Sequence, residues 1–450
     1  MLNAAKFPSI SLRAWLFRPI DGASLIAFRV AFGAIMFWHI TRYFVNEDIG
    51  RFWVEPAFHF TYPGFEWVHP WPGAGMYFHM GILALLALFI AIGAFYRISS
   101  ALFFVGFTYT FLLEHALYLN HLYFVCLVSF LMIFAPVHRA FSVDAWRRPE
   151  SRSEVVPFWP LWMLRTQLAI VYFFGGVAKL NADWIRGEPL RSWLSAKSTT
   201  PIVGPLFHWD ETYWIISGGG LVFDLLIVPL LLWKRTRGAA FVAATIFHLL
   251  NAWFFHIGIF PWFSIVMTTL FFEPDWPRRW LRRRREATPP SAVPTNPSTR
   301  IAQRRTVAMI SVYVMLQLLL PLRHWLYPGN VAWTEEGHEF SWRMRLREKT
   351  GTAVFEVVNP ATMQAWLETA DDHLESWQAR AMLKRPELIR QFAHYLAACN
   401  AREVGGPVQV YVHSSVSLNA REPHPLIVPE IDLSKEPHRL GAAPWITPGP

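Results

Sequence analysis

ASLIAFRVAFGAIMFWHITRYF, residues 23–44, is the first of nine long apolar stretches in this 450-residue chain. A helix needs about 20 mostly apolar residues to cross the hydrocarbon core of a membrane. The stretch is too long for the apolar part of a signal peptide, and no small-residue cleavage site follows it, so we expect a first membrane helix. The other candidate spans are residues 76–96, 98–113, 117–136, 161–180, 212–233, 238–256, 257–273 and 305–322.

The composition agrees with a chain that is partly dissolved in lipid. Hydrophobic residues make up 53% of it and charged residues 16%, whereas soluble domains have about 45–50% and about 25%. The net charge of +9 could indicate a nucleic-acid partner, but the arginines stand between apolar stretches, which is typical of cytoplasmic membrane loops. We therefore expect a lipid bilayer and no nucleic acid. Two cysteines, Cys126 and Cys399, are too few for a disulfide framework or a cysteine metal site.

Basic residues alternate between the two sides of the predicted bundle. The loop 45–75 contains four acidic residues against Arg51 alone. Since cytoplasmic loops are enriched in Lys and Arg, this pattern predicts a cytoplasmic N-terminus and a C-terminal part on the outer, periplasmic or lumenal side. It gives about nine spans, or eight if one segment is re-entrant. The basic groups are Lys6, Arg13 and Arg18; Arg139, Arg147, Arg148 and Arg152; Lys234, Arg235 and Arg237; and Arg278, Arg279 and Arg282–Arg285.

From residue 323 onward charges become frequent and no long apolar stretch follows. The run VQVYVHSSVSL (408–418) alternates and is β-branched, which predicts a strand. KRPELIRQFAHYLAAC (384–399) has the apolar spacing of a helix. The sequence thus predicts a mainly α fold. Residues 1–322 form a polytopic membrane helix bundle with about eight or nine spans, and residues 323–450 form a C-terminal soluble α/β domain on the outer side.

Ionisable residues inside the predicted spans are the first candidates for function, because such groups are costly in lipid. Lys179 ends the apolar run IVYFFGGVAKL (170–180). It could simply extend its amine to the interface. Alternatively, burial disfavours the ammonium form, so a partly desolvated lysine can act as a base near neutral pH. Gly175 and Gly176, one turn earlier, permit close approach of another helix or of a flat ligand.

Two pairs of polar residues accompany this lysine. Asn120 and His121, which follow Tyr118, are expected at the same outer face of the membrane as Lys179. The carboxamide adds hydrogen-bonding capacity beside the imidazole, although a histidine at an interface can also be structural. His248 and Asn251 are three residues apart and share one helix face, where they could equally join helices.

Asp224, within the sixth predicted span, needs a cationic partner. Arg165 in the fifth span is one candidate. The chain has 17 histidines, but the spans contain no HExxH motif and no close set of histidines and carboxylates. We therefore expect no catalytic metal.

The run IVYFFGGVAKLNADWIRGEPL (170–190) resembles the lysine-aspartate-tryptophan region of the vitamin K-dependent gamma-glutamyl carboxylases. The C-terminal part resembles bacterial members of that family through LIRQFAHYLA and SLNAREPHPLIVPEIDL. The membrane module of the family is known as the horizontally transferred transmembrane domain (HTTM). Further matches, in consistent order, are LNHLYF (119–124), FSVDAW (141–146), SGGGLVFDL (217–225), FHLLNAWFFHIGIFPW (247–262), EPDWPRRW (273–280) and FSWRMRL (340–346).

The resemblance implies an integral membrane carboxylase of the carbon–carbon lyase class with coupled quinol epoxidation. In the family a base deprotonates a reduced naphthoquinone, and the anion reacts with dioxygen to give a strongly basic oxygenated intermediate. This intermediate removes a proton from the γ-carbon of a glutamate in a protein or peptide substrate. The carbanion adds carbon dioxide and the quinone leaves as its epoxide. The implied cofactor is reduced vitamin K or a menaquinol-like naphthoquinone, with O2 and CO2 as co-substrates and no metal.

The resemblance also assigns roles to residues. Lys179 corresponds to the base of the family and Asn120–His121 to its key polar pair. His248 corresponds to a histidine near the quinone, with Asn251 one turn on. Tyr118, Gly175 and Gly176 complete the expected cofactor-binding set.

The chain departs from the family pattern at several points. The paired lysines of the family become Ala178–Lys179, so a neighbouring positive charge is missing. The C-terminal region is shorter, which leaves open a menaquinol-like quinone and an acceptor unlike clotting proteins. Two alternatives are a non-carboxylating quinone-binding or assembly protein on the same scaffold, and a transporter. A transporter would show inverted repeats, and none is evident. The sequence does not identify the substrate or the oligomeric state.

Overall fold

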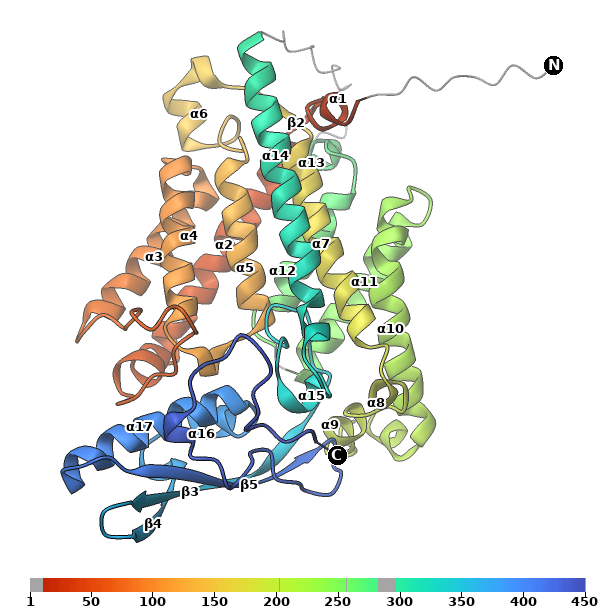
Figure 1. Cartoon of the computed structure of the whole chain (residues 1–450). Coiled ribbons are helices and arrows are strands. Elements are labelled where there is room, and N and C mark those ends of the chain that lie inside the picture. Colours follow the sequence, from red (N-terminus) through yellow and green to blue (C-terminus); the bar gives the residue numbers. More distant parts are fainter. Residues whose placement is uncertain (1–10, 202, 256, 282–296, 450) are drawn as a thin grey trace.

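The membrane part of the chain is a bundle of helices, and the C-terminal part caps one end of it (Figure 1). The computed structural model describes residues 11–201, 203–255, 257–281 and 297–449. In this part of the chain, each of the nine predicted apolar stretches forms a helix. The helices are α2 (Ala23–Val45), α3 (Gly75–Ile92), α4 (Tyr96–Leu112), α5 (Asn120–Phe134), α7 (Trp159–Ala178), α10 (Asp210–Leu232), α11 (Arg237–Phe255), α12 (Phe260–Thr268) and α14 (Pro297–Leu319).

Among the described residues, six helices are long and apolar enough to cross a membrane: α2, α3, α7, α10, α11 and α14. The other three are shorter, with 17 residues in α4, 15 in α5 and 9 in α12. Even with the 3-10 turn η5 (Thr269–Phe271) that follows it, α12 is too short for a full crossing. The predicted polytopic helix bundle is confirmed, with α12 as its shortest member.

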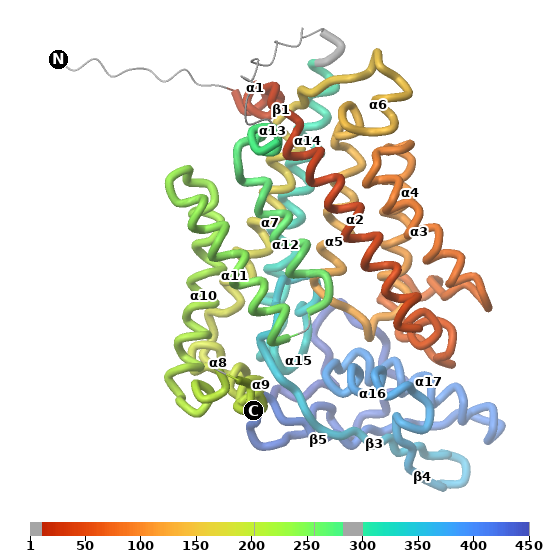
Figure 2. Tube along the Cα trace, turned by 180° about the vertical axis from the view of Figure 1, so that it is seen from behind, coloured from red at the N-terminus to blue at the C-terminus, as the bar shows by residue number. Residues whose placement is uncertain are grey.

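The end of the bundle away from the C-terminal part is rich in arginine. There β1 (Pro19–Asp21) pairs in antiparallel fashion with β2 (Val155–Pro157). Arg278 joins this clasp through ion pairs with Asp21 at 2.8 Å and Glu154 at 2.9 Å. Helices α1 (Leu12–Leu16), α6 (Val143–Arg147) and α13 (Trp276–Leu281) lie at the same end in both ribbon views (Figures 1 and 2). Lys6 and Arg282–Arg285 lie outside the described residues.

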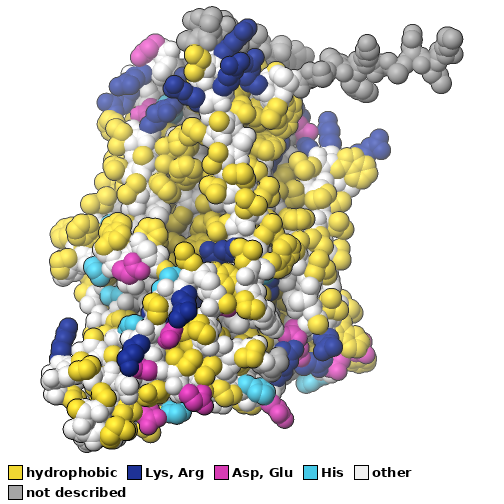
Figure 3. Space-filling view, viewed as in Figure 1, with side chains coloured by type: hydrophobic (Ala, Val, Ile, Leu, Met, Phe, Trp, Pro, Cys, Tyr) yellow, Lys and Arg dark blue, Asp and Glu magenta, His cyan; other side chains and the backbone are white. Residues whose placement is uncertain are grey.

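On the face seen in Figure 3, a hydrophobic surface covers the bundle between two charged ends. On α4, Ile98, Leu102 and Val105 each expose more than half of their surface, and so do Ile215 and Val222 on α10. An apolar surface of this extent is unfavourable in water. It fits a chain that passes several times through a membrane.

The C-terminal part contains a three-stranded antiparallel sheet in the order β4-β3-β5. The strands are β3 (Lys349–Asn359), β4 (Gln364–Thr369) and β5 (Gln409–Leu418). Helices α16 (Ser376–Met382) and α17 (Pro386–Val404) share a hydrophobic core with the sheet. The predicted strand at 408–418 and the predicted helix at 384–399 are both confirmed; Pro386 begins α17 and left-handed Gly405 ends it, as expected for helix termini.

One loop of the C-terminal part, residues 338–346, enters the bundle; we call it the inserted loop. Trp342 is 1% exposed and belongs to the core of the bundle. Its ring stacks on Tyr123 of α5 at 5.1 Å and meets Phe124 at 6.1 Å. Phe124 also contacts Phe263 of the short helix α12. Through Phe124, the inserted loop is thus packed in the same part of the core as α12. The domain boundary expected at residue 322 remains a prediction.

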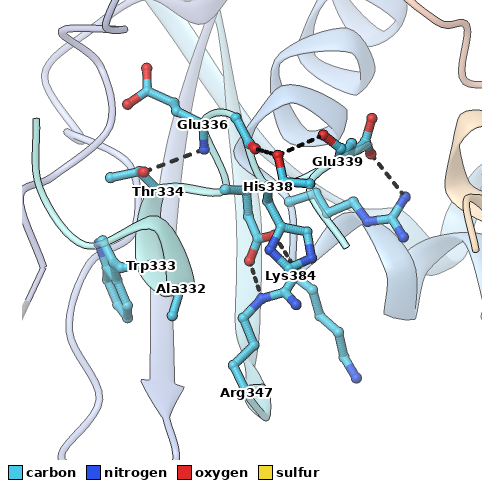
Figure 4. A network of polar contacts seen from close by, with 12 residues as sticks. Ala332, Trp333, Thr334, Glu336, His338, Glu339, Arg347 and Lys384 are labelled. Carbon is cyan, nitrogen blue, oxygen red and sulfur yellow. Dashed lines mark hydrogen bonds and ion pairs between the residues drawn. The ribbon is translucent and has the colours of Figure 1, made fainter. Parts of the chain in front are cut away.

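A buried ion network supports the start of the inserted loop (Figure 4). The carboxylate of Glu335 forms ion pairs with Arg347 and with Lys349, the latter at 2.8 Å. Burial alone would raise the pKa of Glu335, but the charges of Arg347 and Lys349 outweigh burial. The net result is a pKa lowered from the usual 4.5 to about 2. The neighbouring Glu336 has a pKa raised by burial. The ionised form of Glu335 thus stabilises the fold.

This network predicts a specific loss of stability in acid. Because the folded pKa of Glu335 lies below the unfolded value, its stabilisation is complete above pH 4.5 and is lost as the pH falls toward about 2. Glu335→Gln leaves two buried cations without their partner, so at pH 7 we expect a loss of roughly 3–5 kcal/mol. Thermal unfolding of the full-length protein between pH 3 and pH 7 should also show a weaker pH dependence than the wild type.

Glu336→Gln is the matched control, since a carboxyl with a raised pKa does not destabilise the folded state in acid. The control should be at least as sensitive to acid as the wild type. Equal acid sensitivity in Glu335→Gln and the wild type would contradict the assignment.

Candidate functional site at the capped end of the bundle

Lys179 lies at the C-terminal end of α7, where the chain turns into α8 (Ala182–Ile185). Its amine forms an ion pair with the carboxylate of Asp224 on α10. The amine also lies 3.4 Å from the carbonyl oxygen of Gly175 and 5.2 Å from the ring centre of Trp184. The lysine side chain is only 9% exposed, so its amine does not extend into bulk water.

The partner of Asp224 is therefore Lys179, and the candidate pairing with Arg165 is wrong. Arg165 lies almost four turns before Lys179 on α7. It donates hydrogen bonds to the carbonyl oxygens of Leu270 at 2.7 Å and Phe272 at 3.0 Å. These carbonyls end the η5 turn, and the last carbonyls of a helix have no partner within it. Arg165 thus binds the end of η5. It lies near the start of α7, whereas Asp224 is bound at the other end of that helix.

Gly175 and Gly176 let α7 and α10 approach closely enough for the ion pair to form. A Cβ atom on Gly176 would lie 2.7 Å from Cδ2 of Leu225 on α10. A Cβ atom on Gly175 would lie 3.2 Å from Oδ2 of Asp224 and 3.4 Å from Met344 of the inserted loop. The sequence allowed two reasons for these glycines, the close approach of a helix or the binding of a flat ligand. Among the described residues, their contacts are with a helix and a loop.

His248 on α11 forms a buried dyad with Tyr172, a residue that the sequence analysis did not single out. The Tyr172 hydroxyl and His248 Nε2 are 2.6 Å apart. His248 is 1% exposed, and its Nδ1 atom has no hydrogen-bond partner in the described part of the chain. Tyr172 lies seven residues before Lys179, so the two share one face of α7; that spacing was the available signal.

His121 and His248 approach the same aromatic ring. The ring centre of Phe260, at the start of α12, is 6.2 Å from that of His121 and 5.6 Å from that of His248. A Cβ atom on Gly258, just before α12, would lie 3.8 Å from His121 Nε2. Helices α5 and α11 thus bring the two histidines to the start of α12.

Asn120 and Asn251 make local contacts. Asn120 Oδ1 accepts a hydrogen bond from the Tyr118 hydroxyl at 3.0 Å, and that hydroxyl accepts one from the backbone N–H of Phe340 at 2.6 Å. Asn251 donates to the carbonyl oxygen of Phe247 in its own helix at 2.8 Å. Asn120 is therefore tied to the inserted loop, while Asn251 bonds to its own backbone.

The predicted residues form two groups. One surrounds the amine of Lys179 between α7 and α10, and the other surrounds Phe260 with His121 and His248. Within the described residues no hydrogen bond joins Lys179 to His121 or Asn120. Tyr172 links the groups, because it stands on α7 with Lys179 and bonds to His248.

The C-terminal part holds the lysine group from outside. Asp183, four residues after Lys179, accepts a hydrogen bond from Asn419 at 2.8 Å and forms an ion pair with Arg421. Asn419 also accepts one from the backbone N–H of Glu348 at 2.8 Å. In both ribbon views α8 lies at the end that the C-terminal part covers (Figures 1 and 2).

A second contact holds the turn before α5. His115 Nε2 lies 2.7 Å from a carboxylate oxygen of Glu339 in the inserted loop. Arg385 donates to the carbonyl oxygens of His115 at 2.7 Å and Tyr118 at 3.3 Å. Because Asn120 and His121 begin the helix that follows this turn, the C-terminal part also fixes where these two side chains start.

A small apolar cavity lies behind the start of α5. Its volume is about 160 Å³, and it is lined by Leu119 and Leu122, which flank Asn120 and His121, together with rings such as Tyr43. A lining of this kind suits a small apolar molecule better than an ion. Among the described residues no group of three or more His, Cys, Asp or Glu side chains is arranged to hold a metal.

The helix approach at Gly176 yields a prediction. Gly176→Ala places a methyl group against the Leu225 side chain and the Cβ atom of Asp224, and we expect it to destabilise the protein by about 1–3 kcal/mol, as overpacking does. Gly219→Ala on α10 is the control, because a Cβ atom there meets nothing within 4 Å and alanine favours the helix. Thermal unfolding of the purified protein measures both. Similar midpoints for the two variants would contradict the tight contact.

Comparison with known proteins bears on this arrangement. The model of the HTTM domain matches residues 17–276, which is more than half of the chain. The model of the vitamin K-dependent gamma-carboxylase lumenal domain matches residues 302–450. No solved structure matches the chain. The second match begins within α14, at residue 302, and supports a multi-pass membrane protein whose C-terminal part is lumenal. The chain belongs to the vitamin K-dependent gamma-glutamyl carboxylase family, with an HTTM domain followed by a lumenal domain.

Proposed function

We propose that this protein is a membrane gamma-glutamyl carboxylase that couples oxygenation of a reduced naphthoquinone to carboxylation of glutamate side chains with CO2. The observation that carries the proposal is the buried Lys179–Asp224 pair under the lumenal domain. Membership of the family supports the reaction class. The N-terminus lies in the cytoplasm, as the loop charges predict, and the site faces the lumenal or periplasmic side.

In this proposal Lys179 is the base, and Asp224 accepts the proton that the Lys179 ammonium must lose before it can act as one. An ammonium cannot accept a proton, so Lys179 must first lose one. Transfer from the ammonium to the Asp224 carboxylate gives a neutral amine and a neutral carboxylic acid, with no change in total charge. Burial makes this exchange less costly than in water, because it removes two charges from a poorly solvated site. The neutral amine of Lys179 then accepts the proton of the substrate hydroxyl.

The His248 group has the features that a quinol needs. A reduced naphthoquinone, when bound, supplies the reducing equivalents and the strong base for proton removal from glutamate. His248 Nδ1 is buried and has no hydrogen-bond partner among the described residues, so it is free to bond a ligand oxygen. The rings of Phe223, Phe247 and Phe260 surround this histidine, and offer apolar faces to a flat ring. Tyr172 orients the imidazole through Nε2.

Water must be kept from such a site, because solvent protons would quench a carbanion. Trp184 covers the Lys179 amine, and its indole N–H is held by the carbonyl oxygen of Ser217 at 2.8 Å. The inserted loop packs against α5 with Trp342. The apolar cavity lined by Leu119 and Leu122 suits dioxygen and carbon dioxide, which are apolar molecules. Asn120 and His121 position the reacting groups from the side of α5.

The decisive experiment uses the purified full-length protein with a reduced naphthoquinone, a glutamate-containing peptide and labelled bicarbonate. We expect label in the peptide and quinone epoxide in equal amounts. Lys179→Ala should lower both products at least 100-fold, the usual contribution of a general base, and His121→Ala about 100-fold, the usual cost of misplaced reacting groups. Lys234→Ala, at an exposed position of the arginine-rich end, is the control and should keep full activity.

Thermal unfolding of each variant separates loss of activity from loss of fold. Unchanged turnover in both Lys179→Ala and His121→Ala would refute the mechanism. Quinol binding to the wild type without label or epoxide would favour the alternative, a non-carboxylating quinone-binding or assembly protein on the same scaffold.

Asp224 has its own test. Asp224→Asn removes the group that takes the proton from Lys179, so we expect kcat to fall at least 100-fold with little change in the KM for quinol. The acid limb of the pH–rate profile should move, and Asp224→Glu should recover part of the rate. Asp210→Asn, on the exposed start of α10, is the control. If the rate of Asp224→Asn falls only in proportion to the loss of folded protein, and the pH–rate profile does not change, then Asp224 has a structural role alone.

A further inference from the structure

A groove on the lipid-facing surface runs along α14 from the arginine-rich end of the bundle, and none of its lining residues belongs to the candidate site. It has a volume of about 410 Å³ and runs between α1, α7 and α14. Leu12 and Leu16 of α1 and Trp162 of α7 line one side. The other side is α14 from Val307 to Leu319, where Ser311 is the only polar residue of the lining. The groove thus offers an apolar chain a continuous contact.

The length of the groove fits one leaflet of a membrane. Val307 and Leu319 are twelve residues apart, which is about 18 Å along a helix. Half of the hydrocarbon core of a bilayer is about 15 Å thick. One acyl chain of a phospholipid therefore matches the groove from end to end, while α1 lies across its arginine-rich end (Figure 1).

Positive charge stands where the headgroup of such a lipid would lie. Arg304 precedes Val307 by three residues and Ser311 by seven, so it shares their face of α14. Arg300 is one turn before Arg304 on the same face. Both arginines are exposed, and Figure 3 shows basic side chains gathered at this end. Arg305 is also exposed, but a helix turn of 100° directs it away from the groove.

We propose that this groove is a binding site for an anionic phospholipid. One acyl chain lies along α14 between Val307 and Leu319 and under Leu12 and Leu16. The phosphate and the anionic headgroup lie at Arg304 and Arg300. Arginine near the membrane surface attracts anionic lipids, and the apolar lining supplies contact that a flat helix surface lacks. The site is independent of the carboxylase proposal.

The test uses the full-length protein in a nonionic detergent, titrated with palmitoyl-oleoyl phosphatidylglycerol or with the corresponding phosphatidylcholine. Native mass spectrometry gives the affinity of each lipid. We expect tighter binding of phosphatidylglycerol, and an affinity about five-fold lower in Arg304→Gln, since each basic residue near the surface contributes about a factor of that size. Arg305→Gln, the matched control on the other face, should leave the affinity unchanged.

A second pair of variants tests the groove itself. Ser311→Trp places an indole in the groove at an exposed position, so it should block the tight binding without unfolding the helix. Val312→Trp, exposed on the next face, should not.

Several results would overturn the proposal. Equal affinities for the two lipids, or equal effects of Arg304→Gln and Arg305→Gln, would mean that only the general charge of this end attracts lipid. Unchanged binding in Ser311→Trp would exclude the groove. Displacement of bound phosphatidylglycerol by a long-chain menaquinol at equal concentration would show that the groove holds an isoprenoid chain instead.

Discussion

A charge inside a membrane protein needs an opposite charge beside it, and the Lys179–Asp224 pair meets this need between α7 and α10. An unpaired charge in the hydrocarbon layer costs several kcal/mol, so neither helix can move away from the other without that cost. The glycines of α7 make the short distance sterically possible. As a result, the position of the amine is set by two packed helices and by Trp184, and not by a flexible side chain alone.

The lumenal domain completes this arrangement. It holds Asp183, just after the lysine, through Asn419 and Arg421. It holds the turn before α5 through Glu339 and Arg385. These two contacts lie on either side of the candidate site, so the domain fixes both groups of residues at once. A soluble domain that merely recruited a substrate would not need to contact the membrane helices at both points.

Much of the fold could be predicted from the sequence, because apolar length and the positions of arginines follow directly from the membrane. Nine apolar stretches gave nine helices, and the strand at 408–418 was visible in its alternation. The lysine and the histidines were visible as polar residues in apolar runs. The partner of Asp224 was not, because the sequence does not say which end of α7 faces α10.

Tyr172 and the inserted loop were missed for a related reason. A tyrosine in an apolar helix looks like any other packing residue until its hydroxyl meets an imidazole from another helix. Residues 338–346 read as part of a soluble domain because they carry charges. Phe340, Trp342 and Met344 nevertheless pack into the bundle, and contacts between segments so far apart in the chain leave no periodic signal.

The inserted loop also has an unusual backbone. Phe340, Trp342 and Arg345 adopt left-handed conformations, with φ of 58°, 57° and 49°, which bulky residues adopt only when their surroundings hold them there. Those surroundings belong to the bundle: α5 for Phe340 and Trp342, and Phe255 of α11 for Arg345, although the loop belongs in sequence to the lumenal domain. The two halves of the protein are consequently not interchangeable modules. A chimera that joined this bundle to the lumenal domain of a relative would have to keep residues 338–346 together with the helices against which they pack.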